Sequence, residues 1–435
     1  MRIVQAVGWY FPNDSGGTEV YVSELSDRLR AAGHEVLVAA PEAQGREERT
    51  YDYRGVPVYR YPIPQRVTRD EAQGRVVVRG ADRFHEWLRK IQPDVVHMHT
   101  YVTGMGLMEL YAAKALGARV IVTTHAASLG FTCQRGTMMR WGKSLCDGHV
   151  STVKCVPCYL QHRGVSRPFG YLAAAIPQPV SALGRRVNGR AGTWIGMTDL
   201  MAYNRRAQRE MLERADRFVV LTNWARDVVI ANGAPAGKVT INRLGIRYNG
   251  LPPHRKSAKP ITIAYIGRFD PIKGVGDFAR AIAQTRRSSS IHFQLHGPVL
   301  HRADLAVLEH LKMTVGPDAW VTFGGELDAA GVRNALSQID VMCCPSRVVE
   351  GGPTVALEAM AAGVPVVGSD IPGISEIVKD RVNGRLVRPG DPGALARVFA
   401  ELAANPGLVD QWRAALPPVR TMSDVAADYI GLYTA

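Results

Sequence analysis

Short apolar runs alternate with helical patterns along nearly the whole chain. Each run has the length of a strand, and helix-forming segments separate one run from the next. Because both faces of such strands are apolar, the pattern predicts an α/β protein with parallel sheets covered by helices on both sides. The predicted strands are 1–8, 36–40, 95–99, 120–124, 218–221, 261–266, 292–296, 341–344 and 364–367.

The pattern restarts after about residue 250, which predicts two doubly wound domains, at 1–250 and 251–417. The segment 250–260 is polar and proline-rich, as is typical of a linker. The region of about 131–210 is rich in Cys, Gly and Arg and fits the rhythm poorly, so we expect an insertion with helices after about Gln178. Ligands bind at the carboxyl ends of such strands, so we expect the chemistry in a cleft between the domains.

The composition suits a large folded chain with a basic surface. The 435 residues are 46% hydrophobic and carry a formal net charge of +14, mostly from arginine. No apolar run has the length of a membrane span, and no cleavage pattern follows the first strand, so we expect a cytoplasmic protein. Arginine-rich surfaces attract phosphates, anionic lipid and nucleic acid. Because no nucleic-acid-binding motif accompanies the charge, we rank a membrane surface or a phosphate-bearing substrate higher; the alternative is a composition bias without a specific partner.

The segment EGGPTVALE, which begins at Glu350, combines carboxylates, glycines and a helix start. Gly351 and Gly352 allow close approach to the backbone, and Pro353 suits the first position of a helix. The free N–H groups of a helix start attract an anion, while Glu350 and Glu358 can accept hydroxyl hydrogen bonds. The segment favours a sugar joined to a phosphate. The alternative is an ordinary loop and helix with one solvent-exposed and one capping glutamate.

Two further turns have the residues of anion-binding sites. Arg268 and Lys273 follow the predicted strand 261–266 and can converge on one anion. Two fixed cations there would stabilise a departing diphosphate without a metal, whereas the alternative is a surface turn with solvated cations. Near the N-terminus, Gly16 and Gly17 precede an amphipathic helix and offer another place for an oxygen anion.

Together these motifs resemble the retaining nucleotide-sugar glycosyltransferases of family 4 (glycosyl transferases group 1), which have the two-domain GT-B fold. The likeness covers nearly the whole chain, and the combination is specific although each piece alone is not. The matching segments are GG at 16–17, GHEV at 33–36, ADRFVVLT at 215–222, GR at 267–268, KG at 273–274, PS at 345–346, the segment from Glu350 through 367, GISEIV at 373–378 and NGRLV at 383–387. The resemblance implies two Rossmann-like domains and a last helix, about 418–435, that packs back on the N-terminal domain.

The resemblance also implies roles for the matching residues. Arg268 and Lys273 would bind the donor diphosphate, Glu350 would lie near the sugar hydroxyls, and Glu358 would bind the nucleotide ribose. His125 matches a family histidine that contacts the donor sugar; the alternative is a core histidine at a strand end. The implied catalytic set is His125, Arg268, Lys273 and Glu350, and the implied donor-binding set is Gly16, Gly17, Gly267, Gly351, Gly352, Pro353, Thr354 and Glu358.

The implied reaction moves a sugar from a UDP or GDP sugar to a hydroxyl acceptor, which is a glycan, a glycolipid or a small glycoside. The departing phosphate oxygen would take the acceptor proton on the same face, so the reaction needs no protein base and no catalytic metal. One alternative is a sugar-nucleotide epimerase of the same fold, which needs a site base. Another is a non-catalytic sugar-nucleotide-binding subunit, which would be expected to lose Arg268, Lys273 or Glu350.

Four cysteines, Cys133, Cys146, Cys155 and Cys158, fall within one short region. The last two form Cys-Val-Pro-Cys, a knuckle spacing that suits a tetrahedral metal, and four thiolates make a complete zinc set. In a cytoplasmic protein a metal is favoured over a disulfide framework. The sequence therefore predicts a structural zinc; the alternatives are an iron–sulfur cluster, four reduced thiols or two disulfides.

The acceptor side has weaker signals. In the family the N-terminal domain usually chooses the acceptor. Tyr101, Thr103, Met105 and Met108 follow a predicted strand end and are candidates to line an acceptor cleft, with core packing as the alternative. The arginine-rich stretch 185–209 lies beside apolar residues and suits docking on an anionic membrane, whereas a solvated basic face is the alternative.

Overall fold

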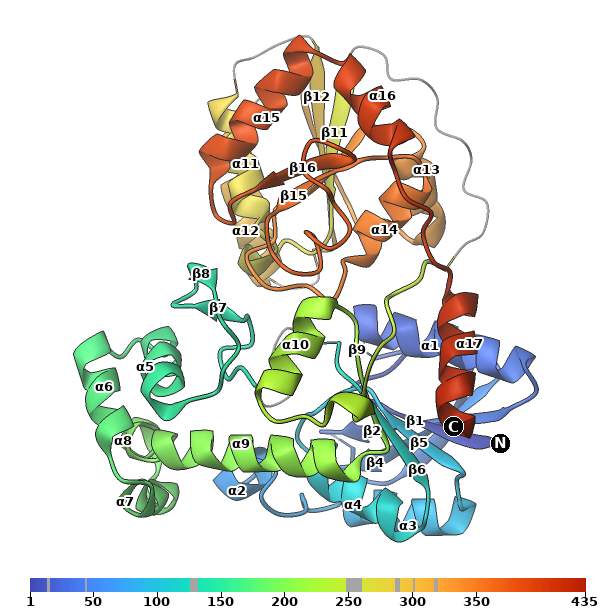
Figure 1. Ribbon diagram of the computed structural model, residues 1–435, viewed down its shortest axis with the longest axis vertical. Coiled ribbons are helices and arrows are strands. Elements are labelled where there is room, and N and C mark those ends of the chain that lie inside the picture. Colours follow the sequence, from blue (N-terminus) through green and yellow to red (C-terminus); the bar gives the residue numbers. More distant parts are fainter. Residues whose placement is uncertain are drawn as a thin grey trace. The chain divides into compact units, whose positions relative to one another are not determined.

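The computed structural model describes residues 1–13, 16–43, 45–125, 132–247, 260–285, 290–299, 302–316 and 320–435 (Figure 1). These residues form two compact units. The N-terminal unit comprises 1–141, 146–243 and 422–435, and the C-terminal unit comprises 142–145 and 244–421. The predicted linker 250–260 lies outside the described residues, apart from Pro260.

The N-terminal unit is built on a twisted sheet of buried strands. Its strands are β1 (Arg2–Ala6), β2 (Glu35–Glu42), β3 (Arg49–Tyr53), β4 (Val56–Pro62), β5 (Val95–Met98), β6 (Arg119–Thr123), β9 (Arg217–Val220) and β10 (Val239–Ile241). Among the described residues they form one eight-stranded sheet in the order β10-β9-β6-β5-β1-β2-β4-β3. Neighbouring strands pair in parallel except β3, which is antiparallel to β4. The parallel pairing brings the carboxyl ends of β6, β5, β1, β2 and β4 to one edge.

Helices from both ends of the chain cover this sheet. They include α1 (Gly17–Ala31), α2 (Arg69–Ala72), α3 (Asp82–Ile91), α4 (Leu107–Ala115), α10 (Asn223–Ala231) and α17 (Met422–Thr434). The last helix, α17, follows the C-terminal unit in the chain but lies beside α1 in the N-terminal unit (Figure 1). Its Val425 and Tyr429 are fully buried, so α17 is part of the core of the N-terminal unit.

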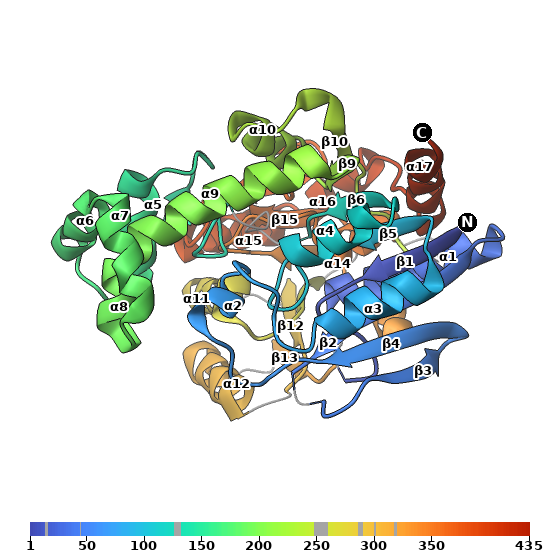
Figure 2. The ribbon, with the colours of Figure 1, turned by 90° about the horizontal axis from the view of Figure 1, so that it is seen from below.

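A group of helices, which we call the helical arm (residues 152–195), lies at one end of the long helix α9 (Met197–Arg214) (Figure 2). The arm consists of α5 (Thr152–His162), α6 (Arg167–Ala175), α7 (Gln178–Ala182) and α8 (Gly189–Ile195), and the short strands β7 (Met139–Arg140) and β8 (Ser144–Leu145) precede it. The expectation that helices begin after Gln178 is wrong, since α5 begins at Thr152. A Cβ at Gly170 would lie 2.8 Å from the Cα of Pro157, so this glycine allows α5 and α6 to pack closely.

The C-terminal unit is a second α/β layer structure. Among the described residues its strands form a six-stranded parallel sheet. The strands are β11 (Ile261–Ile266), β12 (Ile291–His296), β13 (Val321–Gly324), β14 (Val341–Cys344), β15 (Val366–Ser369) and β16 (Gly384–Val387), in the order β13-β12-β11-β14-β15-β16. The helices are α11 (Val275–Gln284), α12 (Arg302–Val315), α13 (Ala329–Leu336), α14 (Thr354–Ala361), α15 (Pro392–Ala404) and α16 (Gly407–Ala414). Phe278, Phe293 and Phe399 pack together at the centre of its core.

One strand lies at residues other than those that the sequence predicted. The strand expected at 364–367 is shifted to Val366–Ser369, because the pairing with β14 begins at Val366. In the part of the chain that the structure describes, no helix has both the length and the apolar character needed to cross a bilayer.

Candidate functional site

In the C-terminal unit, two loops at the carboxyl ends of neighbouring strands carry most of the predicted donor residues. Strand β11 leads into the loop with Lys273, and its neighbour β14 leads into the loop with Glu350. The Nζ atom of Lys273 lies 2.8 Å from Oε1 and 3.1 Å from Oε2 of Glu350. The Ser346 hydroxyl donates to Oε1 of Glu350 at 2.7 Å. The fold thus brings together two residues that are 77 positions apart in the sequence.

Glycines allow the loops to approach one another. Gly274 has a φ of +75°, and a Cβ there would lie 1.8 Å from the carbonyl oxygen of Pro345. Gly373 has a φ of +88°, and a Cβ there would lie 2.1 Å from the carbonyl oxygen of Glu350. Any larger residue would therefore displace the loop that positions the Glu350 carboxylate.

Helix α14 begins directly after the loop that holds Glu350. Gly351 and Gly352 precede it, Gly352 with a φ of +104°. Pro353 occupies the N-cap position, one residue earlier than predicted, and no side chain caps the helix. Thr354 is exposed at the first position. Uncapped N–H groups and the helix dipole make this end of α14 suitable for a phosphate oxygen.

Glu358 lies one turn further along α14 and is only 6% exposed. Its Oε1 is 3.7 Å from Nε of Arg247, a partner that sequence reasoning missed. Burial raises the pKa of Glu358, and the positive charge of Arg247 opposes that shift. A carboxylate held in this way can accept hydroxyl hydrogen bonds from a ligand that reaches it.

The two residues of the predicted cation pair differ in exposure and in their partners. Arg268 has an exposed side chain, whereas Lys273 is partly buried and bonded to Glu350. The Gly267 N–H donates to the carbonyl oxygen of His296, and the Tyr265 hydroxyl donates to that of Arg268 at 2.5 Å, so the backbone of this turn is held on both sides.

In the N-terminal unit, His125 belongs to a chain of buried polar side chains. It follows β6, and His99 follows the neighbouring strand β5, so the two rings lie side by side. Nε2 of His125 is 3.1 Å from Nδ1 of His99, and Nε2 of His99 is 2.5 Å from Oε1 of Gln5. Burial lowers the pKa of His125 to about 3 and that of His99 well below its ordinary value. Both rings are therefore neutral near pH 7.

The same chain continues to helix α17. His97 places Nδ1 at 2.7 Å from the Tyr433 hydroxyl and Nε2 at 2.8 Å from Oγ1 of Thr123. The Tyr429 hydroxyl is 2.8 Å from the same Thr123 oxygen. His97 and His99 interrupt an otherwise apolar run at 95–99. This interruption is the sequence feature from which the chain of buried polar side chains could have been predicted.

Gly16 and Gly17 lie at the start of α1, as predicted. Gly16 is the N-cap residue, and both glycines are exposed. A Cβ at Gly17 would meet no atom within 4 Å, whereas a Cβ at Gly16 would lie 2.6 Å from Oε2 of Glu19. Their proposed role toward a donor stays a prediction.

The predicted zinc site finds no support. Within the described ranges, no group of three or more His, Cys, Asp or Glu side chains can hold a metal ion. Cys133, Cys146, Cys155 and Cys158 are free thiols around a cavity of about 40 Å³. Cys155 and Cys158 lie within α5, which the Ser151 side chain caps, and not in the turn that the knuckle spacing predicted. Burial raises the pKa of Cys155 to about 11, so this thiol stays protonated at neutral pH.

Comparison with known proteins agrees with this arrangement. Residues 16–245 match the family described as glycosyl transferase 4-like domain, and residues 260–405 match glycosyl transferases group 1. The phosphatidyl-myo-inositol mannosyltransferase of Mycobacterium leprae is 25% identical over 403 residues, which cover 92% of this chain and 87% of that protein.

Solved structures share the fold. Sucrose-phosphate synthase from Thermosynechococcus elongatus superposes with a TM-score of 0.66 at 18% identity and covers 100% of this chain and 98% of its own. The Anabaena protein HepE, in complex with UDP-glucose, has a TM-score of 0.64 at 14% identity, with 100% and 99% covered. Because the 4-like match alone spans more than half of the chain, the protein belongs to the glycosyltransferase family with a 4-like domain and a group 1 domain, and it has the GT-B fold.

Proposed function

We propose that this glycosyltransferase transfers a sugar, with retention of configuration, from a UDP or GDP sugar to a hydroxyl acceptor. The observation that carries the proposal is the bonded pair of Lys273 and Glu350 beside the uncapped start of α14. An ammonium group, a carboxylate and free N–H groups within two adjoining loops suit a ligand that has both phosphate and sugar hydroxyls. The UDP-glucose complex of the structural relative HepE supports a donor of this class.

Each donor residue has a role in this proposal. Lys273 and the exposed Arg268 neutralise the diphosphate, and the backbone N–H groups of Gly352 and Thr354 bind its oxygens. Glu350 orients the sugar hydroxyls, and Glu358 accepts from the ribose. His125 contacts the donor sugar, and Gly16 and Gly17 allow a phosphate or the acceptor to approach α1.

The reaction exchanges one bond at the anomeric carbon for another. The bond from that carbon to the diphosphate oxygen breaks, and a bond to the acceptor oxygen forms on the same face. The acceptor proton passes to the departing phosphate oxygen, so the products are a glycoside and a nucleoside diphosphate. Glu350 is neutralised by Lys273 and accepts from Ser346, which makes it a poor free base and favours this route. The cations lower the barrier by stabilising the charge that develops on the leaving group.

We also propose that the helical arm touches an anionic membrane. Phe169 and Leu172 of α6 are 59% and 58% exposed, and they lie three positions apart, on one helix face. Leu183, in the same arm, is 56% exposed, and Arg186 and Arg190 are exposed nearby in the sequence. Apolar side chains next to arginines suit insertion at the headgroup level of an acidic bilayer.

A donor screen followed by an acceptor assay tests the function. The full chain is examined for thermal stabilisation by UDP, GDP, ADP and their hexose conjugates. The conjugate that stabilises best is then incubated with acceptors, and nucleotide release is measured. We expect release that requires an acceptor, whereas acceptor-independent change of the sugar would indicate an epimerase. Absence of both stabilisation and release with every nucleotide sugar would overturn the proposal.

A further inference from the structure

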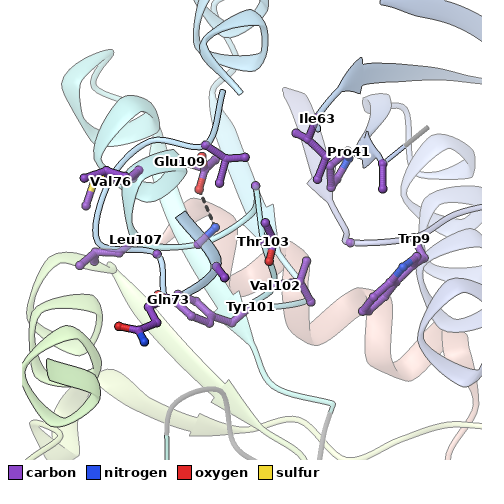
Figure 3. A pocket seen from close by; sticks show the side chains of 18 of the residues that line it. Trp9, Pro41, Ile63, Gln73, Val76, Tyr101, Val102, Thr103, Leu107 and Glu109 are labelled. Carbon is purple, nitrogen blue, oxygen red and sulfur yellow. Dashed lines mark hydrogen bonds between the residues drawn. The ribbon is translucent and has the colours of Figure 1, made fainter. Parts of the chain in front are cut away.

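The N-terminal unit contains a large pocket at the carboxyl edge of its sheet (Figure 3). Its volume is about 1000 Å³, at the upper end of the usual range for small-molecule sites. The walls come from the residues that follow β1, β2, β4 and β5, from the start of α4 and from one face of α9. Tyr101, Thr103 and Met108 line it as the sequence suggested, whereas Met105 is fully buried.

Two lining side chains have polar atoms without a hydrogen-bond partner among the described residues. Glu109 is 4% exposed, and its Oε2 accepts from the Gly106 N–H at 2.6 Å, but its Oε1 has no such partner. His85 places Nε2 at 3.8 Å from Oε1, beyond hydrogen-bond distance. Asn204 of α9 is also 4% exposed, and its Nδ2 is unpaired. Buried polar atoms of this kind are costly unless a ligand or water pairs with them.

These two atoms have opposite hydrogen-bonding character. The carboxylate oxygen of Glu109 can only accept, and the amide nitrogen of Asn204 can only donate. A hydroxyl group does both, so a ligand with several hydroxyls can satisfy each atom. A phosphate dianion cannot donate to Glu109 and would be repelled by its charge.

The remaining charges of the pocket also disfavour an anion. Among the described lining residues, the charged side chains are Glu42, Arg60 and Glu109. Arg60 is 2% exposed, and its guanidinium donates to the carbonyl oxygens of Tyr10 and Pro41, so it holds the backbone. Glu42 is paired with Arg49. No cation of the described lining is thus directed to a bound phosphate.

Apolar side chains supply a further part of the walls, beside uncharged polar residues such as Gln73 and Gln134. Trp9 and Val76 are about half exposed and stand on opposite sides of the pocket (Figure 3). An indole ring offers a flat apolar surface on which the C–H face of a sugar ring can pack. The combination of an aromatic wall with a few convergent polar atoms suits a carbohydrate.

We propose that this pocket binds the acceptor and selects an uncharged glycoside or glycan over an acceptor that carries a phosphate. The inference rests on the proposed function, since it assigns the second substrate of that reaction. Glu109 accepts from one acceptor hydroxyl, Asn204 donates to another, and Trp9 packs on a ring.

Paired ligands test this selectivity directly. The probes are methyl glycosides of glucose, galactose and mannose, each compared with its 6-phosphate. Saturation-transfer NMR on the full chain reads binding without turnover. We expect the best neutral glycoside to bind at least tenfold more tightly than its phosphate. Acceptor-dependent nucleotide release should show the same preference in kcat/KM.

Variants connect the preference to the pocket. Asn204→Asp and Glu109→Gln should each raise the acceptor KM at least tenfold with little change in kcat. Glu109→Gln should also reduce the ratio by which the neutral glycoside binds more tightly than its 6-phosphate. Glu213→Gln, at an exposed carboxylate of α9 outside the pocket, is the matched control and should change neither. If a buried variant does not fold, as judged by thermal unfolding, Trp9→Ala at the half-exposed pocket wall should raise the acceptor KM and serves as the second test.

The outcomes separate the two proposals. If the phosphates bind or react as well as the neutral glycosides, this inference is overturned while the glycosyltransfer stands. An unchanged acceptor KM in the pocket variants would also overturn this inference and leave the glycosyltransfer standing. If the neutral glycosides bind but no nucleotide sugar is turned over, the proposed function is overturned, and the acceptor role with it.

Discussion

Nδ1 of His99 lies 3.1 Å from Nε2 of His125, and this contact sets which nitrogen of His125 carries the proton. With the Gln5 amide oxygen facing His99, Nε2 of His99 is the donor at 2.5 Å. A neutral imidazole has one N–H, so Nδ1 of His99 must accept, and Nε2 of His125 must donate. His125 therefore presents Nδ1 as a lone pair, which can accept a hydrogen bond from a sugar hydroxyl.

His99 is thus predicted to be a positioning residue for His125. His99→Phe should lower kcat/KM about tenfold to hundredfold, because the His125 ring loses its fixed tautomer and orientation. His99→Gln, which can still donate and accept, should restore part of the activity. Steady-state kinetics of nucleotide release measures both effects. Equal losses in the two variants would show that His99 acts only through packing.

The buried histidines also predict a pH dependence of stability. Burial lowers the pKa of His97 and His99 in the folded protein, while the unfolded value is about 6.5. Below about pH 6.5 these histidines bind protons in the unfolded chain but not in the folded protein. The free energy of unfolding is therefore highest above this pH and falls as the pH decreases. Each such histidine contributes at most about 1.4 kcal/mol per pH unit. Urea unfolding between pH 7.5 and 5.5 measures this slope.

Replacing one histidine separates this effect from general acid sensitivity. His97→Gln should flatten the dependence of the unfolding free energy on pH. Identical slopes in the wild-type protein and in His97→Gln would contradict the assignment.

Because Lys273 is bonded to Glu350, we predict that replacing the lysine weakens diphosphate binding and that replacing the glutamate strengthens it. Lys273→Ala should abolish turnover and weaken UDP or GDP binding, because the leaving group loses a cation. Glu350→Gln should also lower turnover but tighten binding of the free nucleotide roughly fivefold, since the carboxylate no longer competes for the ammonium group at a cost of about 1 kcal/mol. Calorimetric titration with the nucleotide measures both changes.

A second lysine–glutamate pair in the same unit provides the control. Lys312 lies 3.0 Å from Glu309 on the surface of α12. Lys312→Ala and Glu309→Gln should leave nucleotide binding and turnover unchanged. Full turnover of Lys273→Ala would refute the donor role of the loop.

We predict that the protein binds acidic vesicles through the helical arm. The double variant Phe169→Ser, Leu172→Ser should reduce partitioning into phosphatidylglycerol vesicles at least tenfold, because each large apolar side chain contributes roughly 1.5 kcal/mol or more when it inserts. Vesicle co-sedimentation is the measurement, with pure phosphatidylcholine as the lipid control. Met313→Ser, at an exposed apolar residue of α12, is the protein control. Equal sedimentation of all variants would contradict a role of the arm.

Much of the secondary structure was predictable because it depends on local chemistry. The strands Ile261–Ile266 and Val341–Cys344 coincide with the apolar runs that predicted them. Edge strands such as β3 were missed, because Arg49–Tyr53 is largely exposed and lacks an apolar run. Helix α5 was missed because its region is rich in Cys, Gly and Arg and lacks a clear helical rhythm, although a helix that begins at a good N-cap can include such residues.

The sequence by itself determined the α/β character, the positions of the glycine turns and the candidate donor residues, since period, turn chemistry and helix starts are encoded within a few neighbouring positions. Only the tertiary structure decided that Lys273 bonds to Glu350, that His99 faces His125, and that the four cysteines do not form a metal-binding group. The pocket with Glu109 and Asn204 was equally invisible along the chain. The reason is that parallel pairing places distant loops at one edge of a sheet, and no local pattern specifies which side chains meet there.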